Sequence, residues 1–198
     1  EVASGVADAV GVLQGERQGA APLLLPASRA GPAPPRTVAR REPRPTLRGD
    51  LETYVVGASN ELAFAVASAV VRSPGHAFKH VVIHGGCGLG KTHLLQGICN
   101  GLTRVQPALN WCYLSGEEFT NEFIYAVKAG QIDAFRTRFR SVDVLVIDDI
   151  HFLANKRATQ AEFLHTFNAI DATGQAVVLS CDCHPRSIAT LTEPLLNR

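Results

Sequence analysis

From about residue 47 onward, short hydrophobic runs alternate with longer segments in which hydrophobic residues recur every three or four positions. Uninterrupted hydrophobic runs are typical of strands covered on both faces, and the longer spacing is typical of amphipathic helices. The pattern predicts strands at 80–84, 110–114, 142–147 and 176–180, and helices at 59–71, 91–102, 116–128, 131–139 and 157–172. Strands that alternate with helices indicate right-handed βαβ units, so the expected fold is α/β, a parallel sheet with helices on both faces.

Each predicted helix carries a hydrophobic face that would pack against the sheet. Ser59 is the expected N-cap of the first helix, because a serine hydroxyl can accept a hydrogen bond from a backbone N–H in the first turn. The residues expected to face inward are Leu62, Val66, Ala69 and Val70 in 59–71; Phe119, Phe123, Ile124 and Val127 in 116–128; Ile132, Phe135 and Phe139 in 131–139; and Phe163, Leu164, Phe167 and Ile170 in 157–172.

The composition changes close to residue 46. Residues 22–48 contain seven of the eleven prolines, six arginines and one acidic residue, and no periodic hydrophobic pattern continues there. A segment of this kind cannot bury enough hydrophobic surface to offset the entropy of ordering it. The sequence therefore predicts a disordered Pro/Arg-rich linker, or the remnant of an upstream domain, at 1–46, followed by one ordered domain at 47–198.

Length and charge exclude several classes of protein. The chain has 198 residues and a formal net charge of +1, so it is not a general polyanion binder. It contains no hydrophobic run of 18 residues, and we expect no membrane span. The five cysteines, an odd number, favour a reducing cytoplasmic setting near the nucleoid over a disulfide framework. Because the chain has no methionine and begins with Glu1, we expect a fragment or a processed product.

One short motif carries most of the chemical information. Residues 85–92 read Gly-Gly-Cys-Gly-Leu-Gly-Lys-Thr, which completes the G-x-x-x-x-G-K-[ST] phosphate-binding loop between a predicted strand and a predicted helix. Glycines allow successive backbone N–H groups to point at phosphate oxygens, and the helix N-terminus adds partial positive charge. Lys91 would reach the β- and γ-phosphates and Thr92 would bind Mg²⁺. The expected binding residues of this loop are Gly85, Gly86, Gly88, Leu89, Gly90, Lys91 and Thr92.

A pair of acids strengthens this interpretation. The hydrophobic run 144–147 ends in Asp148 and Asp149. In nucleoside triphosphatases, an acid at the end of a neighbouring strand holds the Mg²⁺ that the loop hydroxyl also contacts. Asp148 is therefore the candidate metal ligand, together with Thr92, and Asp149 is the candidate group that polarises the attacking water.

With these motifs in place, the segment from about Thr46 to Arg198 resembles the ATPase domain of the bacterial replication initiator DnaA family, which belongs to the AAA+ class. The resemblance rests on 54–60, on the phosphate loop and helix start at 88–96, on the metal strand at 140–143 and 147–153 and on the helix at 162–169. It implies that the segment before the first helix borders the adenine. The additional nucleotide-binding residues implied by the resemblance are Val55, Val56, Gly57, Asn60 and His93.

The resemblance also implies roles for residues outside these motifs. Asp182 lies where the family has its first sensor of the γ-phosphate. Arg198 lies where the family has an arginine finger that reaches the ATP of a neighbouring subunit. Helices 116–128 and 131–139 match the family's initiator-specific insertion, which helps ATP-loaded subunits form a filament around single-stranded DNA. Ile124 and Lys156 fall at or beside positions that face this DNA.

Three positions depart from the family pattern, and the chain stops early. Pro194 replaces an arginine, Ala158 replaces a basic residue beside Arg157, and Cys87 replaces an aliphatic residue in the phosphate loop. Relative to the family, we expect the last strand of the sheet, the helical lid and the C-terminal domain that reads duplex origin DNA to be missing. Single-stranded DNA would then be bound through this domain, and duplex DNA only through the missing one.

The sequence therefore predicts an ATP- and Mg²⁺-binding replication initiator that self-associates in its ATP form, binds and opens origin DNA and hydrolyses ATP slowly, with a replicative helicase or its loader as a further partner. Two alternatives remain open at this point. The first is a helicase-loader or transposition-helper ATPase of the same class, and the second is a non-hydrolysing regulator of the initiator. Cys181-x-Cys183-His184 has only one close cysteine pair, which is weak support for a zinc site.

Overall fold

The computed structural model describes residues 10–11, 44–188 and 190–197 of the chain. Four parallel strands form the centre of the domain: β2 (His80–His84), β5 (Ala176–Cys181), β4 (Val144–Asp148) and β3 (Trp111–Ser115), in that order across the sheet. The two-residue strand β1 (Val10–Gly11) pairs antiparallel with β2. The prediction of a parallel α/β sheet is confirmed. The linker predicted at 1–46 lies almost entirely outside the described residues.

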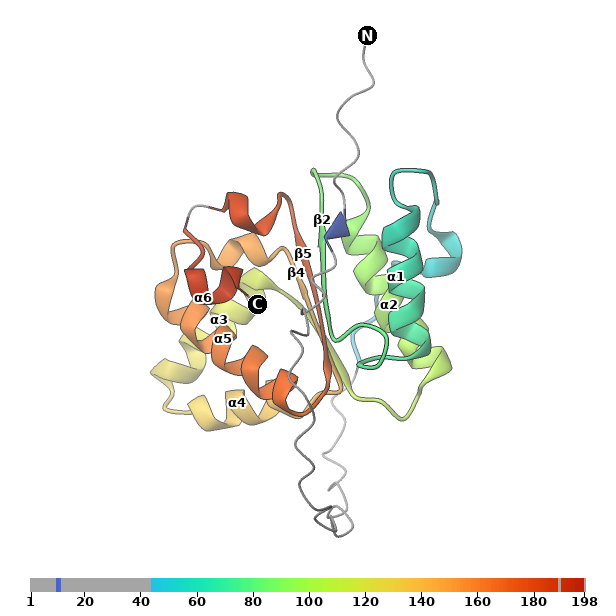
Figure 1. The fold of residues 1–198 in the computed structure, drawn as a ribbon. Helices are drawn as coiled ribbons and strands as arrows, with labels where there is room; N and C mark the ends of the chain where they lie inside the picture. Colours follow the sequence, from blue (N-terminus) through green and yellow to red (C-terminus); the bar gives the residue numbers. More distant parts are fainter. Residues whose placement is uncertain (1–9, 12–43, 189, 198) are drawn as a thin grey trace, which may run out of the picture. The chain divides into compact units, whose positions relative to one another are not determined.

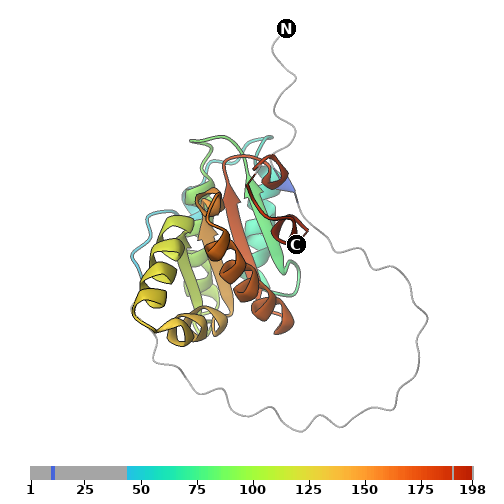
Figure 2. The ribbon, with the colours of Figure 1, turned by 90° about the vertical axis from the view of Figure 1, so that its left-hand side faces the viewer.

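Helices cover both faces of this sheet (Figure 1). One face is covered by α1 (Glu61–Arg72) and α2 (Lys91–Val105). The other is covered by α3 (Gly116–Lys128), α4 (Ile132–Arg140), α5 (Arg157–Ala172) and the short α6 (Glu193–Leu196), which Figure 2 shows from their outer side. Three 3₁₀ turns complete the structure: η1 (Leu51–Thr53), η2 (Ile150–Leu153) and η3 (Pro185–Ser187).

The uninterrupted hydrophobic runs contribute residues to two hydrophobic cores, one on each face of the sheet. On β4, Val144 and Val146 belong to the cluster beneath α1 and α2, whereas Leu145 and Ile147 belong to the cluster beneath α3, α4 and α5. Successive side chains of a strand point to opposite faces, so a strand between two helical layers needs hydrophobic residues at every position. All five residues of β4 are buried.

The structure corrects the predicted start of the first helix. Its N-cap position is Asn60, not Ser59, and α1 begins at Glu61. The Asn60 side chain accepts a hydrogen bond from the Gly57 N–H and donates one to the Val55 carbonyl, which fixes a turn before the helix. The predicted inward face was also partly wrong, since Leu62 is 56 % exposed. The buried residues of α1 are Ala63, Val66, Ala67, Val70 and Val71.

The predicted inward faces of two other helices were partly wrong. On α3, Phe119 and Ala126 are buried, but Ile124 is 43 % exposed and Val127 is also exposed. On α5, Leu164 is only half-buried. The first half of α3 packs on η2 and β3, and Gly116 lies so close to the Asp149 carbonyl that a Cβ would be 2.7 Å from it. Ile124 and Val127 therefore lie on a side of α3 that is exposed to solvent.

Residues 47–54, which we call the strap, run along the outer side of α2. The Asn100 side-chain amide donates to the carbonyls of Leu47 and Gly49 at 3.1 and 2.7 Å. Gly97 allows this close approach, since a Cβ there would be 2.9 Å from Leu51. The strap is therefore fixed to α2 by its backbone.

Asp50 ties the strap to the end of α2 through a charge. Its carboxylate accepts the Glu52 N–H at the start of η1 and pairs with both terminal nitrogens of Arg104, with Nη2 at 2.8 Å from Oδ1. The Arg104 guanidinium lowers the pKa of Asp50 from 3.8 to about 2. A carboxylate whose pKa is lowered by folding stabilises the protein above its unfolded pKa and loses that contribution as pH falls through its folded pKa.

We therefore expect Asp50→Asn, which retains an N-cap oxygen, to lower the free energy of unfolding at pH 7. The difference in the free energy of unfolding between wild type and variant should reach its full value above about pH 5 and fall to about half of that value at pH 3. Urea unfolding at both pH values measures it, with the exposed Asp133→Asn as the control. A difference that is the same at pH 7 and pH 3 would show that the ion pair is not its source.

Two further observations bear on the predicted setting. The five cysteines, all within 44–188, are free thiols. Among the helices of the described ranges, none has both the length and the hydrophobicity needed to cross a bilayer.

Candidate functional site

The phosphate loop joins β2 to α2 at the edge of the sheet where all four parallel strands end. Gly88 and Gly90 have φ values of +80° and +83°, which favour glycine, and α2 begins at Lys91 directly after them. This turn directs the loop back over the start of α2, whose first N–H groups have no partner within the helix. The backbone is thus arranged to receive an anion at this point.

Lys91 is held inside the loop, with only 8 % of its surface exposed. Its Nζ donates to the carbonyls of Gly85 and Gly86 at 2.8 and 2.9 Å and pairs with Asp182 Oδ1 at 2.7 Å. The hydrogen bond from Lys91 lowers the pKa of the Asp182 carboxyl below its usual value. The structure therefore brings together the loop lysine and the residue after β5, which are 91 positions apart in the chain.

The acids predicted after β4 lie at the same edge. Asp148 is 4 % exposed, and its carboxylate accepts hydrogen bonds from the Tyr113 hydroxyl at 2.9 Å and from the Ser180 hydroxyl. Asp149 has a left-handed backbone with φ +54°, and its N–H donates to Ser180 Oγ at 2.7 Å. Burial raises the pKa of Asp149, and the charges of Asp148 and Asp182 raise it further.

An open cavity of about 470 Å³ lies between the loop and the acids Asp149 and Asp182. This volume is within the range of small-ligand pockets. Its lining residues are Arg48, Gly49, Cys87, Gly88, Gly90, Lys91, Thr92, His93, Gln96, Asp149 and Asp182. The sequence prediction missed Arg48, Gly49 and Gln96. Gln96 could have been inferred from the polar stripe that it forms with His93 and Asn100 on α2, but no local signal places the strap at the cavity.

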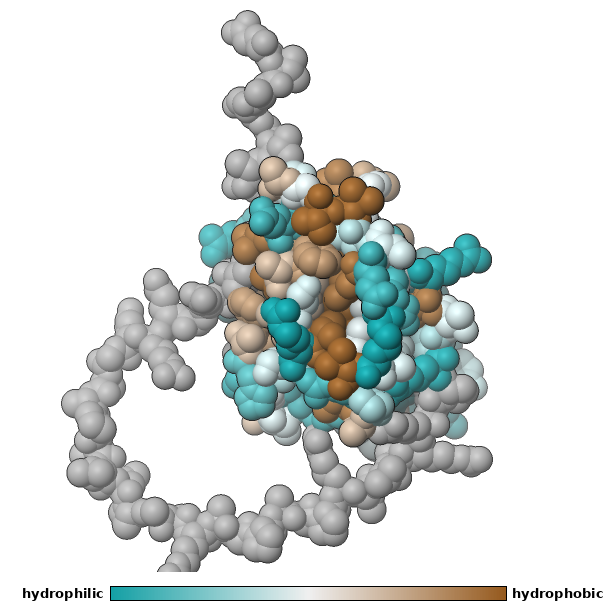
Figure 3. Space-filling view, turned by 90° about the vertical axis from the view of Figure 1, so that its right-hand side faces the viewer, coloured by the Kyte–Doolittle hydropathy of each residue, from teal (hydrophilic) through white to brown (hydrophobic). Residues whose placement is uncertain are grey.

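The residues that the resemblance assigns to the adenine lie before α1. Val55 is 84 % exposed, and Val56 and the loop residue Leu89 are also exposed. The Tyr54 ring lies against Gly90, where a Cβ would be 3.1 Å from it, so this segment begins beside the phosphate loop. Figure 3 shows hydrophobic residues at the upper end of the side of the domain where α1 and α2 lie. Val55, Val56, Gly57 and Asn60 do not line the 470 Å³ cavity.

The predicted metal ligands are oxygen donors, as Mg²⁺ requires. Thr92 is exposed at the start of α2, and the Asp148 carboxylate is held by two hydroxyl groups that leave it further lone pairs. Nearby, ligand atoms of Asp149, His151 and Asp182 lie within 4.8 Å of one another. Oxygen atoms of this kind at the edge of the cavity fit a magnesium ion.

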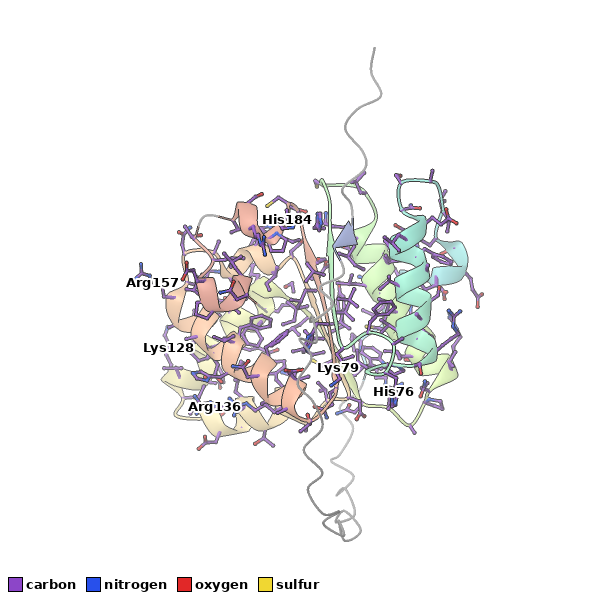
Figure 4. All side chains as sticks on the ribbon, viewed as in Figure 1. His76, Lys79, Lys128, Arg136, Arg157 and His184 are labelled. Atoms are coloured by element: carbon purple, nitrogen blue, oxygen red, sulfur yellow. The ribbon has the colours of Figure 1, made fainter. Side chains whose placement is uncertain are left out.

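The residues assigned to DNA by the resemblance lie on the other side of the sheet. Ile124 projects from α3 with part of its side chain exposed, and Lys156 is at the N-cap position of α5. Figure 4 shows Lys128 and Arg157 on this same outer side. Arg198 lies outside the described residues.

The fold and site together define a class of protein. A phosphate loop follows β2, a buried acid ends β4, and a lysine-paired aspartate follows β5 in a parallel sheet of the order β2-β5-β4-β3. This combination is that of a phosphate-loop nucleotide-binding domain of the AAA+ class.

Comparison with known proteins identifies the family. The model of the bacterial DnaA ATPase domain matches residues 47–198, and the chain belongs to this family. A curated relative, the chromosomal replication initiator protein DnaA of Thermomicrobium roseum, is 48 % identical over 151 residues, which are 76 % of this chain and 32 % of the relative. The chain thus spans about a third of the length of the curated relatives that it matches.

Solved structures agree with this assignment. Domain III of the Thermotoga maritima replication initiation protein DnaA has a TM-score of 0.75 and 35 % identity, covering 77 % of this chain and 65 % of that one. A replication initiator DnaA bound to AMPPCP and single-stranded DNA has a TM-score of 0.73 and 34 % identity, covering 75 % and 46 %.

Proposed function

We propose that this domain binds ATP with Mg²⁺ and that the bound nucleotide controls its assembly with further copies on single-stranded DNA during the initiation of chromosomal replication. The observation that carries the proposal is the single cavity in which Lys91, Thr92 and Asp182 meet beside the buried Asp148. In this proposal, residues 47–198 are the nucleotide-binding domain and 1–46 are a linker.

The bound nucleotide would replace contacts that the protein now makes with itself. Lys91 holds the loop carbonyls and Asp182, so an incoming γ-phosphate would offer it a second anionic partner. Thr92 and Asp148 would hold Mg²⁺, which supplies charge neutralisation at the phosphates. Asp149, with a raised pKa, would hold and orient water near the γ-phosphate, and slow hydrolysis to ADP would end the ATP-bound state.

Two further elements would connect the nucleotide to assembly. Arg198, as an arginine finger, would contact the γ-phosphate bound to a neighbouring copy, a contact that ADP lacks. The exposed side of α3 and the start of α5, with Ile124 and Lys156, would face single-stranded DNA, where cationic groups meet phosphates and hydrophobic groups pack on sugar and base. The AMPPCP- and DNA-bound relative supports this combination of ligands.

The test is the affinity for a fluorescently labelled single-stranded oligonucleotide, measured by anisotropy with MgATP and with MgADP. We expect tighter binding with MgATP. Lys156→Ala should weaken binding and reduce the slope of log affinity against log salt concentration by about one, because one phosphate contact is lost. The matched control is Lys79→Ala, since Lys79 is exposed and precedes β2, at the edge of the sheet opposite the phosphate loop (Figure 4). Equal affinity in the two nucleotides would contradict the proposed switch.

A further inference from the structure

A line of hydrogen bonds runs from the strap to the candidate metal ligand. The backbone N–H groups of Arg48 and Gly49 donate to Gln96 Oε1 at 3.1 and 2.9 Å. Gln96 Nε2 donates to the Tyr113 hydroxyl at 3.4 Å, and that hydroxyl donates to Asp148 Oδ2 at 2.9 Å. Two side chains, Gln96 and Tyr113, thus connect the strap to the buried carboxylate of Asp148.

The direction of each hydrogen bond is fixed by the one before it. Two backbone donors on Oε1 orient the Gln96 amide so that its NH₂ group faces Tyr113. Because the Tyr113 oxygen accepts this N–H, its own proton is directed to Asp148. Aligned donors of this kind polarise and strengthen one another.

The sheet places Tyr113 where it can do this. Tyr113 is opposite Val146 in the parallel pairing of β3 and β4, and Asp148 is two residues further along the same face. The other carboxylate oxygen of Asp148 accepts the Ser180 hydroxyl. Both oxygens of the Asp148 carboxylate therefore accept a hydrogen bond. If either the Tyr113 or the Ser180 hydroxyl were removed, the carboxylate would be less firmly oriented.

The strap can occupy this position only because residue 49 is a glycine. A Cβ on Gly49 would lie 2.5 Å from the His93 carbonyl oxygen and 2.9 Å from Gln96 Cβ, and the first of these atoms is backbone and cannot move aside. Arg48 and Gly49 also line the nucleotide cavity. The strap thus contacts Gln96 at one end of the hydrogen-bonded line and also lines the cavity.

We propose that Tyr113 is a positioning residue for the Mg²⁺ site, holding Asp148 in the orientation that binds the metal, and that through Gln96 it makes this orientation depend on the docking of the strap. Asp148 as metal ligand is part of the proposed function, on which this inference rests. The consequence is that any displacement of the strap weakens the binding of Mg²⁺ with ATP.

Tyr113→Phe removes one hydroxyl and retains the ring that packs in the core beneath α2. The quantity to measure is the ratio of ATP affinities with Mg²⁺ and with EDTA, by calorimetry on the 198-residue chain. We expect the variant to lose about fivefold to tenfold in this ratio while its ATP affinity in EDTA is unchanged, because one hydrogen bond to a charged group is lost. A merely structural defect would lower both affinities. Tyr125→Phe, an exposed tyrosine on α3, is the control.

The strap is tested with Gly49→Ala alone and combined with Tyr113→Phe. Gly49→Ala alone should reduce the ratio of ATP affinities with Mg²⁺ and with EDTA. Added to Tyr113→Phe, it should reduce that ratio no further, because the two changes act through one line of contacts. Equal ratios in wild type and Tyr113→Phe overturn the inference while leaving the proposed function intact. A further loss in the double variant, equal to that of Gly49→Ala alone, overturns the route through Tyr113. If wild type itself binds ATP equally with Mg²⁺ and with EDTA, the inference and the proposed metal site both fail.

Discussion

Replacing Lys91 with alanine is expected to lower the affinity for MgATP by about a hundredfold, since a nearly buried, charged hydrogen-bonding group is removed from the phosphate loop. The lysine has three anionic or carbonyl partners in the free protein and 8 % exposure, so no other side chain can take its place by a simple rotation. Calorimetry with MgATP measures the effect.

The matched control is Lys128→Ala, which removes an exposed lysine from the end of α3 and should bind ATP as wild type does. Because Lys91 also pairs with Asp182, thermal unfolding of each variant without nucleotide is needed to separate lost binding from lost folding. Wild-type affinity in a folded Lys91→Ala variant would refute the assignment of the phosphate site.

The second large effect is expected at Phe119, the centre of an aromatic cluster that attaches α3 to the rest of the domain. Its ring is fully buried, and its centroid lies 5.3, 5.4 and 5.7 Å from those of Phe135, Phe139 and Phe163. Phe119→Ala should reduce the free energy of unfolding by about 3–5 kcal/mol, through lost burial and the cavity that remains. Urea unfolding measures this change.

Tyr125→Ala on the same helix is the control, because Tyr125 is 69 % exposed and its loss should change stability by less than about 0.5 kcal/mol. Similar destabilisation by the two substitutions would mean that the cluster does not anchor α3. Amide hydrogen exchange should also be fastest in α3 and α4 of the Phe119 variant, since the Phe119 ring joins α3 to Phe135 and Phe139 of α4.

The sequence predicted the elements whose signals are local. Uninterrupted hydrophobic runs predicted four parallel strands, and all four are present: β2 has the predicted bounds, and the ends of the other three differ by at most two residues. The predicted helix at 157–172 has the bounds of α5. The phosphate loop was recognised because its chemistry requires glycines, a lysine and a hydroxyl at fixed spacing, and Asp148 because it ends a hydrophobic strand.

Periodicity was less reliable for the faces of helices. Ile124 and Val127 satisfy the spacing of an inward face, yet both are exposed, whereas Phe119 and Ala126 of the same helix are buried. The hydrophobic pattern records which residues could be buried together. How much of a helix the neighbouring elements cover depends on the position of η2 and α4, which no pattern within α3 contains.

The sequence by itself determined the class of fold, the phosphate loop and the acid after β4, because each depends on residues that are neighbours in the chain. Only the tertiary structure placed Arg48 and Gly49 at the cavity and connected Gln96, Tyr113 and Asp148. These residues come from the strap, a helix and two strands, and their contacts depend on strand order, register and the close approach that glycine permits. Such contacts form only when distant segments pack together, and so the spacing of residues along the chain carries no record of them.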